Sequence, residues 1–198
     1  MLNHHRGLWG YSGEARDGQP LSVQSTGMGG PSTAIVIEEL IALGARSFVR
    51  IGTCGALDPA LSLGDLVVAS QALAEDGAST ALGATGPIAA DRRLTAALAE
   101  AAAAPERTVA SVDLFYQERS PGSATRHESP ATAVEMEAAT LFRLAQLRHA
   151  RAACLLAVTD VLEGGAARRA GRLGPKEIEA VGLRLGEAAL SALIADTR

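Results

Sequence analysis

The sequence is poor in aromatic residues, in cysteine and in clustered positive charge. Aromatic residues make up 3% of the 198 residues, and the two cysteines, Cys54 and Cys154, lie far apart. This spacing argues against a zinc knuckle and a disulfide-stapled secreted scaffold, so we expect a reducing, cytoplasmic environment. No block of Lys and Arg offsets the net charge of -4, and the N-terminus lacks a signal-peptide layout. Since no apolar run approaches the roughly 20 residues of a membrane span either, we expect neither nucleic acid nor a membrane as a partner.

Hydrophobic residues are plentiful, at 47% of the chain. A chain of this length buries about 70% of the surface that its unfolded form exposes, so a core needs neither disulfides nor metals. Segments with a strand pattern alternate with segments of helical periodicity, and no repeat or linker divides them. We therefore expect a single α/β domain over residues 1–198.

Hydrophobic periodicity and turn residues predict the individual elements. Helices are expected over residues 32–44, 91–104, 134–147 and 175–197, and strands over residues 21–25, 46–52, 63–69, 108–115 and 152–158. In this interpretation the first strand, the first helix and the second strand form a βαβ unit. Loops are expected over residues 53–56, 76–87 and 117–130.

Four loops are candidates for a binding site, because ligands of open α/β sheets bind beyond the carboxyl ends of the strands. They span residues 26–32, 53–56, 115–119 and 159–165. The first contains the sequence GMGGPS, which either receives an anion at the amides of the following helix or is a tight turn. It is no dinucleotide fingerprint, since Ser32 stands where a third glycine is needed.

Four charged residues lie at positions where the sequence around them indicates either a structural or a ligand-binding role for the charge. Arg50 interrupts an apolar strand, so it pairs with a carboxylate, reaches solvent or holds an anion, with the Thr53 hydroxyl as a further donor. Glu135 and Glu137 stand at the start of a predicted helix, where acidic residues complement the helix dipole. Asp160 follows a buried strand, so it is either a ligand-facing acid or a helix N-cap.

Six sequence blocks occur in an order that points to a known family. They are HRGLWGYSG at 5–13, STGMGGPSTAIVIEELIALGAR at 25–46, VRIGTCGAL at 49–57, SVDLFY at 111–116, VEMEAATLF at 134–142 and VTD at 158–160. On these blocks the chain resembles, over residues 5–198, the nucleoside phosphorylase family of hexameric purine nucleoside phosphorylases and uridine phosphorylases. The resemblance implies a three-layer fold with a central twisted mixed sheet flanked by helices.

The resemblance also implies an activity, the reversible phosphorolysis of a nucleoside to free base and ribose 1-phosphate in nucleoside salvage. Such a pentosyltransferase takes inorganic phosphate as a co-substrate and uses no cofactor and no metal. The chain would be a homo-oligomer, a dimer at least and a hexamer in the family, because one phosphate-binding arginine comes from a neighbouring subunit.

The matching positions imply roles for individual residues. Asp160 matches the acid that protonates the leaving base in purine enzymes, assisted by an arginine for which Arg168, Arg169 and Arg172 are all candidates. The other implied ligands are, for phosphate, Arg50, Thr53 and the neighbouring subunit's equivalent of Arg6; for ribose, Glu137, Met136 and the adjacent Glu135; and for the base, Phe115, Thr159, Val134, Gln117 and Arg119.

Two features leave alternatives open. Family members begin with a strand, a Gly-Asp-Pro loop and a further phosphate-binding arginine, which this chain is expected to lack. Either its natural start lies upstream, or it is a shortened relative that binds nucleosides with weak or no catalysis. Thr159 before Asp160 favours a purine nucleoside, whereas Gln117, Glu118 and Arg119 match the Gln-Glu-Arg with which uridine enzymes bind uracil. We expect a purine nucleoside, with uridine as the alternative; a nucleosidase is disfavoured, because it has no use for two arginines at the nucleophile.

Overall fold

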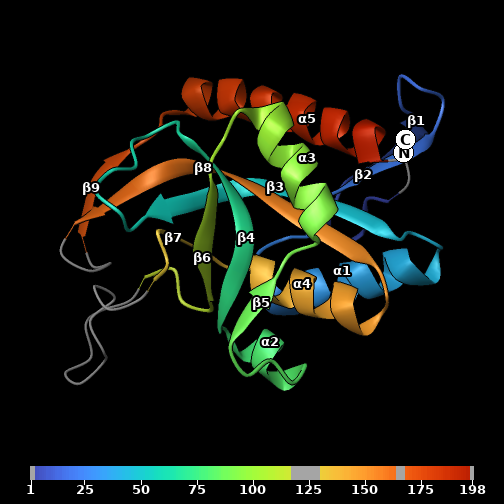
Figure 1. Ribbon diagram of the computed structural model, residues 1–198, viewed down its shortest axis with the longest axis horizontal. Coiled ribbons are helices and arrows are strands. Elements are labelled where there is room, and N and C mark those ends of the chain that lie inside the picture. The colour runs from blue at the N-terminus through green and yellow to red at the C-terminus, as the bar shows by residue number, and fades with distance from the viewer. Residues whose placement is uncertain (1–2, 117–129, 164–167, 197–198) are drawn as a thin grey trace.

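The computed structural model describes residues 3–116, 130–163 and 168–196 (Figure 1). Within them, a central seven-stranded sheet lies between two layers of helices, and a two-stranded sheet stands apart. One face carries α1 (Gly29–Ala42), α2 (Gly77–Ala81) and α4 (Ala138–Leu147), and the other carries α3 (Arg92–Ala102) and α5 (Pro175–Asp196). The expected three-layer α/β architecture is confirmed.

The large sheet consists of β3 (Ser47–Ala56), β4 (Leu66–Glu75), β5 (Pro87–Ala89), β6 (Glu106–Val112), β7 (Ala133–Glu135), β8 (Arg151–Glu163) and β9 (Arg168–Arg172). Its strand order is β5-β4-β6-β7-β3-β8-β9. Since β4 also pairs with β8, the strands β4, β6, β7, β3 and β8 close into a ring. Parallel pairing joins β3 to β8, β4 to β6 and β6 to β7, and the other pairs are antiparallel, so the sheet is mixed.

The central strand β8 is buried on both faces. Its side chains alternate between two hydrophobic clusters: Leu156 and Val158 pack with residues of α1 and α4, and Leu155 and Ala157 pack with residues of α3 and α5. All four are completely buried. A strand covered on both faces has no polar side, and this is why its sequence is continuously apolar.

The strands and helices predicted from periodicity are present. The strands correspond to β2 (Pro20–Gln24), β3, β4, β6 and β8, and the helices to α1, α3, α4 and α5. α3 also begins where its sequence indicates, because the Asp91 side chain caps it by accepting from the amide of Leu94 at 2.9 Å. Among the described residues, no helix combines the length and the apolar character needed to cross a membrane.

The βαβ interpretation of residues 21–52 is wrong. β2 pairs with β1 (Gly10–Glu14) instead of joining the sheet of β3, and their antiparallel register sets Tyr11 opposite Val23. The local pattern could not reveal this partner, because alternation of apolar residues marks a strand without identifying the strand beside it.

Several predicted loops contain regular structure. β3 continues through residues 53–56, because Gly55 and Ala56 find antiparallel partners in β7. Residues 133–135 form β7 where a helix start was expected, and α2 lies within the predicted loop 76–87. β5 and β9 lie in segments for which no helix or strand was predicted. These elements are short, and caps or neighbouring strands hold them in place, so periodicity is a weak signal for them.

Candidate functional site

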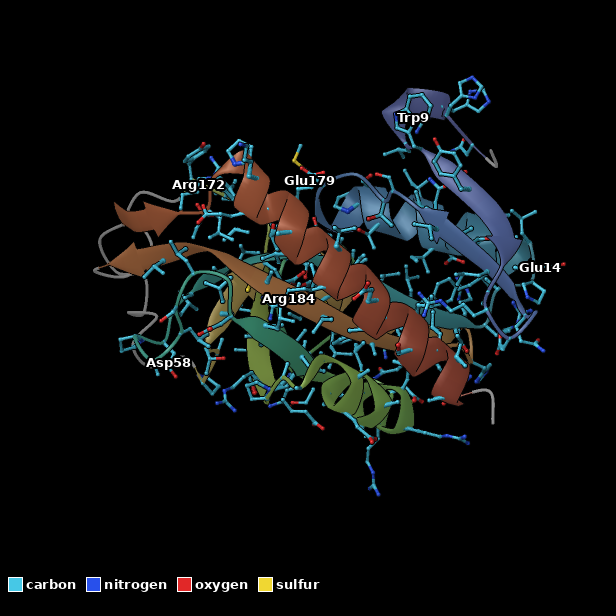
Figure 2. All side chains as sticks on the ribbon, turned by 90° about the horizontal axis from the view of Figure 1, so that it is seen from above. Trp9, Glu14, Asp58, Arg172, Glu179 and Arg184 are labelled. Carbon is cyan, nitrogen blue, oxygen red and sulfur yellow. The ribbon has the colours of Figure 1, made fainter. Side chains whose placement is uncertain are left out.

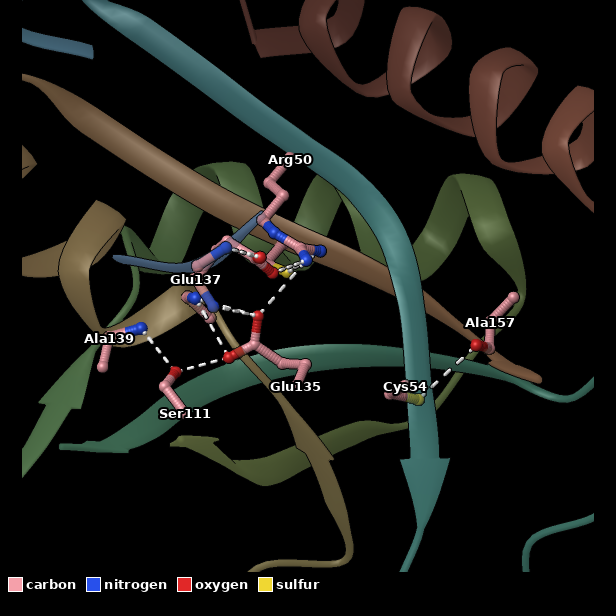
Figure 3. A network of polar contacts seen from close by, with 10 residues as sticks. Arg50, Cys54, Ser111, Glu135, Glu137, Ala139 and Ala157 are labelled. Atoms are coloured by element: carbon pink, nitrogen blue, oxygen red, sulfur yellow. Dashed lines mark hydrogen bonds and ion pairs between the residues drawn. The ribbon is translucent and has the colours of Figure 1, made fainter. Parts of the chain in front are cut away.

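Arg50 lies in β3, and its guanidinium is held between two carboxylates (Figure 3). Nη2 forms an ion pair with Glu137 and lies 3.4 Å from Oε2 of Glu135, while Nη1 donates to Sγ of Cys154 at 3.9 Å. Burial by itself lowers the pKa of Arg50, but the neighbouring Cys154, Glu135 and Glu137 raise it above its ordinary value. The guanidinium therefore stays charged, and of the alternatives drawn from the sequence, pairing with carboxylates is the arrangement seen.

The space for this guanidinium is left by Gly52, two residues further along the same strand face. A Cβ at position 52 would lie 2.8 Å from Cζ and 3.0 Å from Nη2 of Arg50, and it would overlap Nη1. Any side chain at this position would therefore displace the guanidinium. Sequence reasoning did not select Gly52; its spacing from Arg50 on a predicted strand was the signal that could have found it.

Glu137 connects Arg50 to the start of α1. It stands at the N-cap position of α4, and its carboxylate accepts a hydrogen bond from the amide of Gly29 as well as the ion pair from Arg50. Gly27 and Gly29 have φ angles of 76° and 82°, which glycine adopts without strain. α1 therefore begins at Gly29, three residues earlier than predicted, with its first amide bound by a carboxylate of this chain.

Glu135 and Ser111 form a buried network behind Glu137. The Glu135 carboxylate accepts from the Ser111 hydroxyl, from the amide of Glu137 at 2.8 Å and from the amide of Ala138 at 2.9 Å. Ser111 in β6 accepts in turn from the amide of Ala139 at 2.8 Å. Burial raises the pKa of Glu135, and Arg50 and the hydrogen bond from Ser111 oppose this rise without cancelling it. Ser111 was not among the predicted residues, although it opens the block SVDLFY.

Asp160 lies near the end of β8, opposite Arg172 of β9. The Thr159 hydroxyl donates to Oδ2 of Asp160 at 3.0 Å, and Nε of Arg172 lies 3.8 Å from Oδ1. The Asp160 side chain is 10% exposed. β8 continues past Asp160 to Glu163, so the alternative that Asp160 caps a helix is wrong.

Cys54 is a buried residue of β3 that follows Arg50 by four positions and precedes Gly55, the partner of Asp160. Burial raises its pKa, and the charges of Glu135, Arg50 and Asp160 all act on its thiol. The Thr159 hydroxyl also lies 3.5 Å from the carbonyl oxygen of Cys54. Arg50 pairs with Cys154 of β8 and Asp160 pairs with Gly55 of β3, so the cation and the acid stand on neighbouring parallel strands, five positions apart along β3.

Other predicted residues stand close to these groups along the chain. Val134 and Met136 flank Glu135 and are half-buried, and Thr53 is exposed on β3. Phe115 follows β6 and is 52% exposed, with its ring edge-on to that of Tyr116 at a centroid distance of 5.0 Å.

Arg6 belongs to the N-terminal segment of the chain. It is exposed on the short 3-10 turn His5–Gly7, which precedes the β1–β2 hairpin. Figure 2 shows Trp9, the third residue after it, toward the opposite end of the molecule from Arg172. Gln117 and Arg119 lie outside the described residues, so the structure assigns them no contact.

Comparison with known proteins agrees with the resemblance. The family model described as the phosphorylase superfamily matches residues 2–195. A uridine phosphorylase of Thermococcus kodakarensis is 40% identical over 173 residues, which cover 78% of this chain and 62% of that protein. A guanosine phosphorylase of Halorubrum lacusprofundi is 37% identical over 155 residues, or 75% of this chain and 64% of that protein. A DeoD-type purine nucleoside phosphorylase of Roseobacter denitrificans is 34% identical over 175 residues, or 84% and 74% of the two chains.

The names of these relatives divide between uridine and purine nucleosides. The chain spans less than two thirds of the length of the first two, at 62% and 64%. The family model nevertheless matches almost the whole of this chain. The chain therefore belongs to the phosphorylase superfamily, together with these uridine and purine nucleoside phosphorylases.

Proposed function

We propose that the chain is a nucleoside phosphorylase, which transfers the pentose of a nucleoside to phosphate and releases the free base. The observation that supports this best is the placement, on neighbouring strands, of Arg50 against Glu137 and of Asp160 beside Arg172. Phosphorolysis needs a held anion on one side of the sugar, a group for the sugar hydroxyls and an acid beside the base. This arrangement offers all three.

At the phosphate end, Arg50 would hold the nucleophile with its charged fork, together with the exposed Thr53 hydroxyl. Phosphate would take over the guanidinium donors that now point to Glu137. Arg6 of a second copy would supply a further cation, so we propose that the active form is a homo-oligomer, a dimer at least. No cofactor or metal takes part in this scheme.

At the sugar, Glu137 would accept hydrogen bonds from the ribose hydroxyls, and the half-buried Met136 would pack against the ring. A phosphate oxygen then bonds to the anomeric carbon while the bond from this carbon to the base nitrogen breaks, and its electron pair leaves with the base. Positive charge that develops on the sugar lies next to the Glu137 carboxylate, which stabilises it.

At the base, we propose that Asp160 protonates the base as it leaves. This is the role that the resemblance implies for the matching acid of purine enzymes, so it favours a purine nucleoside. Arg172 is the arginine we assign to assist it, because its Nε lies 3.8 Å from Oδ1 of Asp160. Arg168 and Arg169 belong to the same strand, but their side chains lie outside the described residues. Phe115, Thr159 and Val134 would line the base.

Uridine is the second candidate substrate. It is favoured by relatives named uridine phosphorylase at 40% and 41% identity and by the Gln117–Arg119 sequence. In the uridine enzymes of the family, extra residues separate the tyrosine from this Gln-Glu-Arg, whereas here Tyr116 and Gln117 are adjacent. We therefore place uridine behind the purine nucleosides.

The test is the release of free base from inosine, guanosine and uridine by the 198-residue chain, each with and without phosphate. We expect phosphate-dependent release that is faster from the purine nucleosides, with ribose 1-phosphate as the second product. Release from uridine alone would reassign the substrate, and release without phosphate would make the chain a nucleosidase. No release from any nucleoside would contradict the proposal and favour a relative that binds nucleosides without catalysis.

A further inference from the structure

Glu135 and Glu137 are two residues apart, yet their carboxylates lie in different surroundings. The Glu135 side chain is completely inaccessible to solvent, whereas that of Glu137 is 8% exposed. We propose that Glu135 and Ser111 form a positioning unit, which holds Arg50 and the start of α4, and through them Glu137, in the geometry the reaction needs. This inference rests on the proposed function and gives Glu135 a part other than the ribose contact that the resemblance implies.

The contacts of Glu135 leave it little capacity for a ligand. Its oxygens accept from the Ser111 hydroxyl, from the Glu137 amide, and from the Ala138 amide at 3.0 and 2.9 Å, and Oε2 also faces Nη2 of Arg50 at 3.4 Å. A carboxylate has about four lone-pair sites, and these donors are enough to fill them. A ribose hydroxyl could bind here only by displacing a donor of the chain itself.

Ser111 fixes the same network from the neighbouring strand β6. Its hydroxyl has one proton, which it donates to Glu135, and its oxygen accepts from the Ala139 amide at 2.8 Å. The amides of residues 137, 138 and 139 are therefore bound by two side chains from β7 and β6. These are amides that the first turn of a helix leaves without a partner, so Glu135 and Ser111 together fix where α4 begins.

Arg50 gains a second anchor from this arrangement. Its Nη2 contacts both Glu137, which we propose binds ribose, and Glu135, which no solvent reaches. When ribose hydroxyls engage Glu137, Glu135 remains as the countercharge that keeps the guanidinium in the site. Glu137 would therefore contact the ligand directly, whereas Glu135 contacts Arg50 and the start of α4, which hold Glu137 in place.

Substrates that lack one ribose hydroxyl distinguish this role from a ribose contact. We expect Glu135→Gln and Ser111→Ala to raise the KM for phosphate about tenfold and to lower kcat/KM equally for a ribonucleoside and for its 2'-deoxy and 3'-deoxy analogues. If Glu135 bound a ribose hydroxyl, the analogue without that hydroxyl would be insensitive to Glu135→Gln. Such insensitivity, or an unchanged KM for phosphate, would overturn the inference.

A matched variant controls for the loss of a charge. Glu100→Gln neutralises an exposed carboxylate on α3 and should leave all these kinetic constants unchanged. Thermal melting shows whether each variant is folded. If Glu135→Gln does not fold, Ser111→Ala provides the same comparison, because it deletes only one hydroxyl and leaves the carboxylate in place.

Hydrogen exchange separates a failure of this inference from a failure of the proposed function. If the parent chain shows no phosphorolysis, the proposed function fails, but the positioning unit is still tested at the amides of Ala138 and Ala139. We expect slow exchange at both amides in the parent and faster exchange in Ser111→Ala and Glu135→Gln. Exchange that is equal in parent and variants would refute the positioning unit, whatever the activity.

Discussion

Gly52 leaves open the space in which the Arg50 guanidinium lies, and this makes position 52 sensitive to a single added methyl group. The backbone there is not in the left-handed region, so alanine fits it without strain. We expect Gly52→Ala to move the guanidinium away from its carboxylates and to raise the KM for phosphate about tenfold, which corresponds to the loss of one charge-assisted hydrogen bond. We also expect a lower melting temperature, because the buried carboxylates of Glu135 and Glu137 lose their countercharge.

The control for this variant is Gly86→Ala, because a Cβ at position 86 would meet nothing within 4 Å. Steady-state kinetics at varied phosphate and a thermal melt measure both effects. A normal KM for phosphate in Gly52→Ala would mean that the position of the guanidinium seen here does not matter for phosphate.

The two buried cysteines should behave as inert thiols. Burial raises the pKa of Cys154 to about 12, against a smaller opposing effect of Arg50, and burial also raises the pKa of Cys54. Since the thiolate is the reactive form, it is scarce near neutral pH. We expect a disulfide reagent to label neither cysteine of the folded chain at neutral pH, and both at once in denaturant. Rapid labelling of the folded chain would show that these residues are accessible.

At the scale of elements, Asp196 ties the end of α5 to the rest of the fold. Its buried carboxylate pairs with Nε of Arg93 in α3 at 3.2 Å and with Arg151 at the start of β8. Removing this carboxylate would leave both arginines without this anion. We expect Asp196→Ala to lower the free energy of unfolding by about 1–3 kcal/mol. The loss stays in this range because both arginines are partly exposed, so water stabilises their charge.

Denaturant unfolding checks this prediction, with Glu38→Ala as the control. Glu38 of α1 forms an ion pair with Arg148, which follows the end of α4, and both side chains of this ion pair are well exposed to water. We therefore expect a much smaller change for Glu38→Ala. Equal effects of the two substitutions would show that α5 does not depend on the buried carboxylate.

The sequence predicted the long elements and missed the short ones for one physical reason. β8, α1, α3 and α5 have enough residues to show which faces are buried, and all four were found. β7 has three residues and exists because it lies between β6 and β3, which local sequence does not encode. The same holds for the site: Arg50 and Asp160 stand out as charges in apolar strands, whereas Ser111 and Gly52 matter only through neighbours that the fold supplies.

At the scale of the whole molecule, the β1–β2 hairpin carries an apolar face. Tyr11 and Val23 face each other across the hairpin and are 53% and 61% exposed, and Trp9, two residues before Tyr11, is 53% exposed. Contiguous exposed apolar residues are typical of protein interaction surfaces, so we propose that this face contacts a partner. In the proposed homo-oligomer, this partner is a second copy of the chain. Because Arg6 shortly precedes β1 in sequence, such a contact would bring the Arg6 of one copy toward the site of the other.

Mixing two inactive variants tests whether the sites are shared between copies. Arg6→Ala and Arg50→Ala should each abolish most phosphate-dependent release of base. In a mixed dimer, one site combines the intact Arg50 of one copy with the intact Arg6 of the other, so random exchange should restore about a quarter of all sites. The measurement is base release before and after the two variants are unfolded and refolded together, with light scattering to establish the oligomer. Activity that stays at the sum of the separate variants would show that Arg6 acts in its own copy or not at all, because only a site built from two chains can be repaired by mixing.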